Sequence, residues 1–166
     1  MAAQDIINGL DFARRAQEVH GTIAVSQFSR LHDVIASNEG ALTWRLFGNV
    51  EDGKPRLHLK VHGELVLMCQ RCLGPMRYEV DIDTLYYLVT DESAIPPEEE
   101  DLDDREYLVA EPQMQVAGLI EDEVLLSLPL APKHAECKPS VEVADEGKPN
   151  PFAVLQALKA GRDRTN

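Results

Sequence analysis

The sequence is poor in aromatic residues and lacks any long apolar run. Aromatic side chains make up 5% of its 166 residues, so a core must be built mainly from aliphatic side chains. No stretch reaches the roughly 18 consecutive apolar residues of a membrane-spanning helix. The opening residues, MAAQDIINGLDFARR, lack the basic segment followed by an apolar one that marks a secretory signal. We therefore expect a cytoplasmic protein with no membrane association.

Cysteine is scarce as well, with three residues. In a reducing compartment, which the missing export signal predicts, a structural disulfide is unusual. No Ser/His/Asp arrangement, phosphate-binding loop or dinucleotide fingerprint is present. The sequence therefore predicts neither a catalytic site nor a small-molecule substrate.

Negative charge is what the sequence has in excess, with a formal net charge of −13. Much of it lies in residues 91–106, DESAIPPEEEDLDDRE, which hold nine acidic residues and one arginine. RNA-binding proteins usually carry a basic stripe, because neutralised phosphates supply most of their affinity. The net negative charge therefore argues against RNA binding through the electrostatic field of the whole molecule. Like charges and two prolines predict a mobile acidic loop at 91–105.

Alternation of apolar and polar residues predicts three long strands in succession. The first contains Leu42, Trp44 and Leu46 and ends at the turn signal Glu51-Asp52-Gly53. The second and third strands place their apolar residues at every other position: Leu57, Leu59, Val61, Leu65 and Leu67, then Tyr78, Val80 and Ile82. Short connections between them predict an antiparallel meander. Shorter strands are expected at 19–25 and 107–110.

Helices are predicted from caps and apolar spacing. Asp11 is the expected N-cap of a helix from Phe12 to about Glu18, and Ser26 of a further turn carrying Phe28 and Leu31. Apolar residues at 119–128 predict a helix that Pro129 ends. A loop at 138–149 precedes a C-terminal helix opened by Asn150-Pro151. The fold class is therefore a single α+β domain over 1–166, with a meander of about five strands and packed helices.

The stretch MCQRCLGP, residues 68–75, falls between two predicted strands and so forms a hairpin tip. A thioredoxin-type Cys-x-x-Cys lies instead between a strand and a helix, which disfavours a redox role. The pair His134 and Cys137 repeats the same two-residue gap, so Cys69, Cys72, His134 and Cys137 could bind one tetrahedral Zn²⁺. The two halves are separated by 61 residues, far more than in a zinc finger. The alternative is that all three cysteines are ordinary packed side chains, and the sequence leaves both readings open.

Two other groups of polar residues suggest chemistry but have simpler explanations. His58 and His62 are four residues apart on a strand, about 13 Å, which is too far to share one ion. We expect them on a solvated face. Glu121, Asp122 and Glu123 lie in the early turns of a predicted helix, where carboxylates suit the helix dipole. A structural role is therefore favoured over acid chemistry.

The segment KPNPFAVLQALK, residues 148–159, is a candidate docking element. A rigid Pro-Asn-Pro precedes an aromatic residue and a short apolar helix face. Aromatic side chains often anchor interfaces. The alternative is that Phe152 covers the sheet of its own chain. With the hairpin-tip arginine, the candidate partner-binding residues are Arg71, Lys148, Asn150, Pro151 and Phe152.

Three segments together, CQRCLGP, EDEVLLSLPLAPKHAEC and KPNPFAVLQALK, resemble the bacterial YceD family, the large ribosomal RNA subunit accumulation proteins. LDFARRAQEVHG is similar to the opening helix of that family. The resemblance implies a role in synthesis, processing or stability of large-subunit (23S) ribosomal RNA, without a catalytic activity. Some relatives have a fuller second cysteine pair where this chain has His134 and Cys137, which permits a Cys₃His site.

Two functions are compatible with these features. The first is an interaction module whose acidic loop attracts basic ribosomal proteins or assembly factors. Any direct contact with ribosomal RNA would then use local cations, namely Arg71, Lys133, Lys138, Arg162 and Arg164. The second is a metal-dependent enzyme acting on ribosomal RNA. Four protein ligands would fill a zinc shell, whereas a catalytic zinc keeps one position open, and this favours the first.

Overall fold

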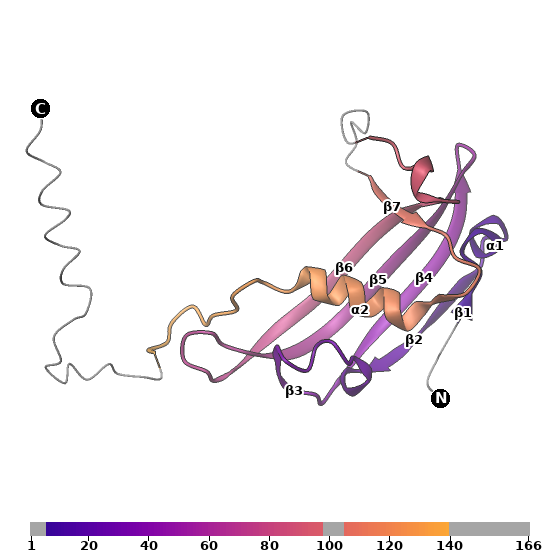
Figure 1. The fold of residues 1–166 in the computed structure, drawn as a ribbon. Helices are drawn as coiled ribbons and strands as arrows, with labels where there is room; N and C mark the ends of the chain where they lie inside the picture. Colours follow the sequence, from indigo (N-terminus) through magenta and orange to yellow (C-terminus); the bar gives the residue numbers. More distant parts are fainter. Residues whose placement is uncertain (1–5, 98–104, 140–166) are drawn as a thin grey trace, which may run out of the picture.

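The computed structural model describes residues 6–97 and 105–139 (Figure 1). Within them lie two α-helices, two short 3₁₀ turns and a majority of strands, so the predicted α+β class in one sheet-rich domain is confirmed. The elements in chain order are β1 Ile6–Ile7, α1 Gly9–Arg14, β2 Glu18–Ala24, η1 Val25–Gln27, β3 Ile35–Ser37, β4 Ala41–Glu51, β5 Lys54–Met68, β6 Pro75–Val89, η2 Glu92–Ala94, β7 Glu106–Val109, β8 Met114–Gln115 and α2 Val116–Ser127.

The main sheet has six strands in the order β2-β4-β5-β6-β7, with β3 also paired to β5. Its pairings are antiparallel except at one edge, where β7 runs parallel to β6. The expectation of an antiparallel sheet of about five strands is therefore wrong for this edge. A separate two-stranded pairing joins β1 to β8, so that Ile6 lies opposite Gln115.

The β4–β5 hairpin follows directly from its turn residues. Asp52 and Gly53 both adopt positive φ angles, 53° and 74°, which is the geometry of the tight hairpin turns that match the twist of the flanking strands. Beyond the turn, the leucine and valine residues at odd-numbered positions of β5 are at most 1% exposed: Leu57, Leu59, Val61, Leu65 and Leu67. The period-two pattern therefore points one complete side-chain row of β5 into the core.

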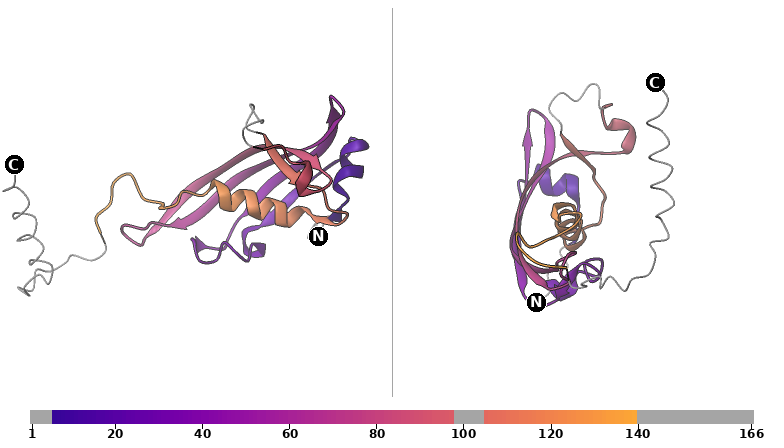
Figure 2. Two further views of the ribbon diagram at one scale, coloured as in Figure 1. Left: turned by 45° about the horizontal axis from the view of Figure 1, so that its top comes forward. Right: turned by 90° about the vertical axis from the view of Figure 1, so that its left-hand side faces the viewer.

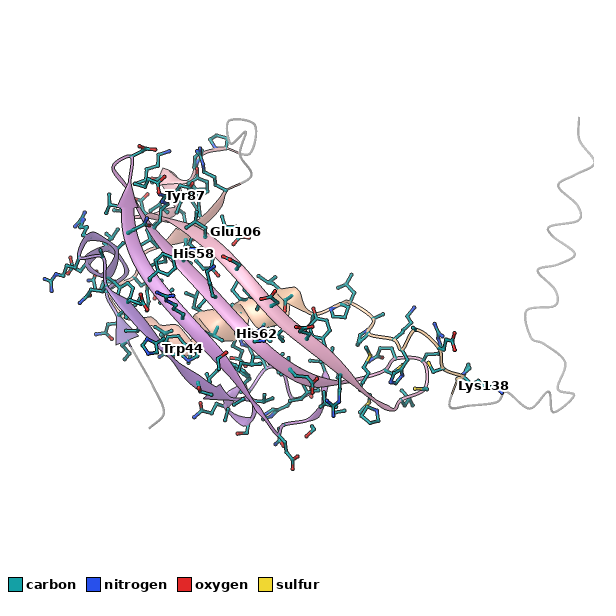
Figure 3. The ribbon with its side chains drawn as sticks, turned by 180° about the vertical axis from the view of Figure 1, so that it is seen from behind. Trp44, His58, His62, Tyr87, Glu106 and Lys138 are labelled. Atoms are coloured by element: carbon teal, nitrogen blue, oxygen red, sulfur yellow. The ribbon has the colours of Figure 1, made fainter. Side chains whose placement is uncertain are left out.

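Helix α2 lies against one face of this sheet, and the sheet curves around it (Figures 1 and 2). Val116, Ile120 and Val124 of α2 are buried in the same core cluster as the inward residues of β4, β5 and β6. The opposite face of the sheet carries no helix of the described chain and presents polar side chains (Figure 3). None of the described helices is long and apolar enough to cross a membrane.

Helix α1 begins earlier than the sequence predicts. Asn8, not Asp11, is the N-cap, and its side-chain Oδ1 accepts a hydrogen bond from the backbone N–H of Asp11. The helix then ends at Arg14. The turn expected after Ser26 is a 3₁₀ turn at Val25–Gln27 without a side-chain cap, although Phe28 is buried as its apolar character suggests.

Two predicted segments fall partly or wholly beyond the described chain. The acidic loop is described only at 91–97 and 105, where Asp91 caps the η2 turn. The C-terminal helix, with Lys148, Asn150, Pro151 and Phe152, lies outside the described residues, as does most of the loop at 138–149. These predictions stay predictions.

Candidate metal centre

The Cys-x-x-Cys pair forms the tip of the long hairpin between β5 and β6. The segment that follows α2 runs to the same tip, and the backbone N–H of Gln70 donates to the carbonyl of Pro132 at 2.8 Å. This bond joins two parts of the chain about 60 residues apart in sequence. The fold therefore brings the His134–Cys137 segment to the hairpin tip, the condition that a metal site with so long a gap requires.

The tip itself is a tight turn closed by the backbone. The N–H of Cys69 donates to the carbonyl of Gly74, and the N–H of Leu73 donates to the carbonyl of Cys69, each at 2.9 Å. Leu73 adopts a positive φ of 57°, which is unusual for a bulky residue. The turn directs the thiols of Cys69 and Cys72 toward the segment after α2.

The four predicted ligands converge on one point. Cys69 Sγ lies 3.8 Å from Cys137 Sγ, and Cys72 Sγ lies 3.3 Å from His134 Nδ1. All four ligand atoms lie within 4.8 Å of one another. A tetrahedral zinc with Zn–S bonds of about 2.3 Å separates neighbouring sulfurs by about 3.8 Å. The donor set and spacing therefore fit a Cys₃His metal site, and among the described residues this is the group near enough to hold an ion.

None of the three cysteines forms a disulfide with a described residue. A disulfide has its sulfurs about 2.05 Å apart, and all three cysteines are free. Cys69 is fully buried, while Cys72 and Cys137 are half-buried. Cys72, Cys137 and His134 surround the buried thiol of Cys69. Ordinary packing of three cysteines does not require such a polar cluster.

A backbone carbonyl fixes the tautomer of His134. Its Nε2 lies 3.1 Å from the carbonyl oxygen of Pro75, which can only accept a hydrogen bond. Nε2 therefore carries the ring proton, and the lone pair of Nδ1 faces the sulfurs. Metal-bound histidines are commonly held by such an outer hydrogen bond. This role of Pro75 could not be predicted from residue type, because the acceptor is a backbone carbonyl, which every residue has.

The thiols are held in unlike environments. Burial raises the pKa of the Cys69 thiol, but the backbone N–H groups of Cys72, His134 and Arg71 point at its sulfur and outweigh burial, so the pKa is lowered to about 5. Burial and the neighbouring sulfurs of Cys69 and Cys72 raise the pKa of Cys137. Backbone donors aimed at a sulfur stabilise the thiolate, which is the form that binds a metal.

His62 is exposed as expected, whereas the His58 side chain is only 24% exposed. His58 pairs with Asp83 and packs against the Phe47 ring, with centroids 4.7 Å apart. His62 lies 3.9 Å from Asp81. Figure 3 places both on the helix-free face, away from Lys138, which follows Cys137 in the sequence.

The acidic triplet on α2 is used structurally, but for a different reason from the one predicted. The helix begins at Val116, so its first turn holds no acidic residue and the dipole argument does not apply. Instead Glu121 accepts hydrogen bonds from the backbone N–H and Nε of Arg30, at 2.7 and 3.1 Å. Asp122 accepts from the same guanidinium, and Glu123 accepts from the hydroxyl of Thr84. Arg30, which the sequence pattern did not single out, therefore joins α2 to the segment that follows η1.

Comparison with known proteins agrees with these features. The family model described as "Large ribosomal RNA subunit accumulation protein YceD" matches residues 57–159, more than half of the chain. The chain is also 32% identical over 113 residues to the Haemophilus influenzae protein (strain ATCC 51907 / DSM 11121 / KW20 / Rd) called "Large ribosomal RNA subunit accumulation protein YceD". That alignment covers 60% of this chain and 63% of the relative. No solved structure matches the chain.

The family match includes β5, the hairpin tip, α2 and the segment that carries His134 and Cys137. The elements that build the candidate metal centre therefore all lie inside the matched region. On this evidence the chain belongs to the YceD family.

Proposed function

We propose that the chain is a non-catalytic factor in the synthesis, processing or stability of large-subunit (23S) ribosomal RNA. It acts in the cytoplasm as an interaction module during biogenesis of the large ribosomal subunit. The printed description of the family and of the Haemophilus influenzae relative supports the link to large-subunit ribosomal RNA. The interaction role is argued from the site.

The observation that carries the non-catalytic role is the convergence of four protein ligands. Three sulfurs and one imidazole nitrogen within 4.8 Å of one another would complete a tetrahedral Zn²⁺ shell. A zinc bound there supplies a cross-link and has no open position for water or substrate. Its role would be to fasten the segment after α2 to the hairpin tip.

The runner-up, a metal-dependent enzyme acting on ribosomal RNA, has less support. The carboxylates that could assist it are already engaged, because Glu121 and Asp122 hold Arg30 and Glu123 accepts from Thr84. These contacts join α2 to the segment that follows η1 and to β6, and none of them involves the cysteine cluster. None of them is placed beside the metal site to activate a water.

For partners, we propose basic ribosomal proteins or assembly factors in addition to ribosomal RNA. Residues 91–106 supply a dense negative charge, and Asn150, Pro151 and Phe152 are residue types that predict a preset helix start with an apolar face. Negative charge attracts basic protein surfaces and steers their approach. Crosslinking and pull-down from cells, with RNA and protein both identified, would name the partners.

Two measurements test the proposal together. In cells that lack the chain, we expect the ratio of large-subunit to small-subunit ribosomal RNA to fall, and wild-type protein to restore it. A Cys72→Ser and Cys137→Ser double variant should restore it poorly. Purified zinc-loaded protein should leave large-subunit precursor RNA intact with or without a chelator. Chelator-sensitive cleavage would replace the proposal with the enzymatic one, and an unchanged ratio in cells would remove the link to ribosomal RNA.

A further inference from the structure

We propose that the hairpin tip is the surface that contacts RNA, and that it takes a single-stranded segment. The basic tip is defined here as Arg71, Leu73, Lys133 and Lys138. The choice of RNA rests on the proposed function, because the family description supplies the reason to expect that partner. The choice of surface rests on charge, exposure and backbone geometry, and it is independent of the description.

Four cations on the sheet, namely Arg45, Arg56, Lys60 and Arg77, are each paired with a carboxylate of the fold, whereas Lys54, at the turn end of β5, forms no ion pair with a described residue. Arg45 pairs with Glu18 at 2.8 Å, and Lys60 pairs with Asp83 at 2.7 Å. A phosphate approaching either cation would meet the carboxylate as well. The helix-free face, which Figure 3 shows, therefore offers little net attraction to RNA.

The tip cations are placed differently. Arg71, Lys133 and Lys138 are exposed. Arg71 donates to the carbonyl of Cys137 at 3.4 Å, and none of the three forms an ion pair with a carboxylate of the described chain. Glu136, also exposed, is the acidic neighbour in this segment. In a protein with a net charge of −13, this group of cations is left available to an anion.

Distance separates the tip from acidic residues at the other end of the sheet. Strands β5 and β6 are 15 residues each, about 50 Å, and Glu51, Asp52, Asp91 and Glu92 lie at their opposite end. Figure 3 likewise places Lys138 far from Tyr87 and Glu106. Salt screens charges over about 8 Å at physiological ionic strength. The tip can therefore hold a polyanion that the remainder of the molecule repels.

Leu73 points to the form of the RNA. Its side chain is 58% exposed, and its φ of 57° is a conformation that glycine adopts without strain and leucine does not. An exposed leucine side chain on a strained backbone does not add to the stability of the core. Unstacked bases of single strands accept apolar and stacking contacts, whereas bases of an A-form duplex are hidden. A leucine beside three cations suits a single strand.

The number of cations sets an expected salt dependence. Neutralising three phosphates of a single strand gives a slope of about −2 in log affinity against log salt concentration. Between 50 and 200 mM salt the affinity should then fall on the order of 20-fold. Broad binding along the molecule would give a steeper slope.

The experiment uses the full zinc-loaded chain and a fluorescein-labelled 12-nucleotide single-stranded RNA of mixed sequence, followed by fluorescence anisotropy. The tip variant carries Arg71→Gln, Lys133→Gln and Lys138→Gln. The matched control carries Arg45→Gln, Lys54→Gln and Lys60→Gln, and so changes the net charge equally at positions away from the tip. The tip variant should lose at least tenfold in affinity at 50 mM salt, with a slope near zero, and the control should stay within about threefold. Zinc content of each variant reports whether the tip is intact.

A second variant separates contact from folding. Leu73→Gly relaxes the backbone, so the thermal midpoint should rise or stay unchanged while RNA affinity falls at least threefold. Equal losses in the two triple variants, or no RNA binding by the wild type at 50 mM salt, would overturn the inference. So would a tip variant that keeps its RNA affinity but loses capture of polyglutamate, which would assign the surface to an acidic protein. Normal ribosomal RNA levels in deletion cells would remove the proposed function while leaving tip-dependent RNA binding intact.

Discussion

Glu121 is a carboxylate buried between α2 and the segment that follows η1. Its side chain is 11% exposed and receives two hydrogen bonds from Arg30, one of them from the backbone. Buried carboxylates are costly unless each oxygen has a partner, and here both oxygens do. This residue fixes α2 against a loop 91 positions earlier in the sequence.

Replacing Glu121 by alanine should lower the free energy of unfolding by about 2–3 kcal/mol, because hydrogen bonds to a charged group are lost and an N–H is left without its acceptor. Asp122→Ala is the matched control, since Asp122 also pairs with Arg30 but is 55% exposed. It should cost less than about 1 kcal/mol. Urea denaturation of both variants measures the difference. Equal small losses would mean that Glu121 does not stabilise the fold.

Asp83 provides a pH-dependent contact on the helix-free face. The hydrogen bond from Lys60, and secondly that from His58, lowers the pKa of the Asp83 carboxyl. A carboxyl whose pKa is lower in the folded state stabilises the protein above its unfolded pKa of about 3.9. That contribution is lost as the pH falls through the lowered folded pKa.

We expect Lys60→Met to raise the pKa of Asp83 toward its ordinary value, and His58→Phe to raise it less. Carboxyl titration by NMR measures both shifts. The same Lys60 variant should lose less stability than wild type between about pH 4 and the lowered pKa. An Asp83 titration that does not respond to Lys60 would contradict the contact.

At the scale of elements, α1 and β4 approach one another unusually closely at Gly48. A Cβ atom built on Gly48 would lie 2.6 Å from Ala13 Cα and 2.9 Å from the carbonyl oxygen of Phe12. Both are backbone atoms, which cannot move aside as a side chain can. The absence of a side chain at position 48 therefore sets how closely the helix packs on the sheet.

Gly48→Ala should displace α1 and lower the free energy of unfolding by about 1–3 kcal/mol. Gly118→Ala is a control of opposite sign, because Gly118 is inside α2 and the nearest atom to an added Cβ is 3.9 Å away. That change should stabilise the protein by about 0.5–1 kcal/mol. Chemical denaturation decides, and a stabilised Gly48→Ala variant would show that α1 is not held by this contact.

The long strands could be predicted because a sheet with one buried face imposes a period of two on the sequence. In β5 the buried residues Leu57, Leu59, Val61, Leu65 and Leu67 follow this period, whereas Val66 lies on the other row. The start of α1 could not be predicted in the same way. Asn8 and Asp11 are both good N-cap residues, and only the backbone geometry selects Asn8. The parallel pairing of β7 to β6 was also beyond prediction, because a four-residue strand carries no sign of its direction.

For the whole molecule, a metal bound at the candidate centre would fasten the peripheral hairpin tip and not the core. The ligands Cys72, His134 and Cys137 are half-buried, whereas the core cluster is formed by α1, α2 and the inward rows of the sheet. The ligand set could be proposed from spacing alone, because each pair has the same two-residue gap. The convergence of the four ligands could not be predicted, because it depends on the position of the segment that follows α2 relative to the hairpin tip.

Zinc removal should therefore loosen the tip and leave the sheet in place. We expect about one zinc per chain, and after chelation at least tenfold faster amide exchange at Gln70 and Leu73, whose hydrogen bonds close the tip. Amides of β4 and β5 should change less than about threefold. Hydrogen exchange with mass spectrometry measures both regions. Loss of protection throughout the sheet would show that the metal organises the entire fold, and a metal-free protein with an unchanged tip would exclude the zinc site.

The pairing of β1 with β8 has a consequence for the order of events during translation. Ile6 lies opposite Gln115, so the first strand has no partner until the ribosome has made 109 further residues. At about 5–20 residues per second, that delay is about 5–20 s. The β4–β5 and β5–β6 hairpins, by contrast, can close as soon as each emerges from the exit tunnel. Strand β1 must therefore wait for its partner, and the synthesis of β8, rather than hairpin formation, sets the moment at which this pairing can form.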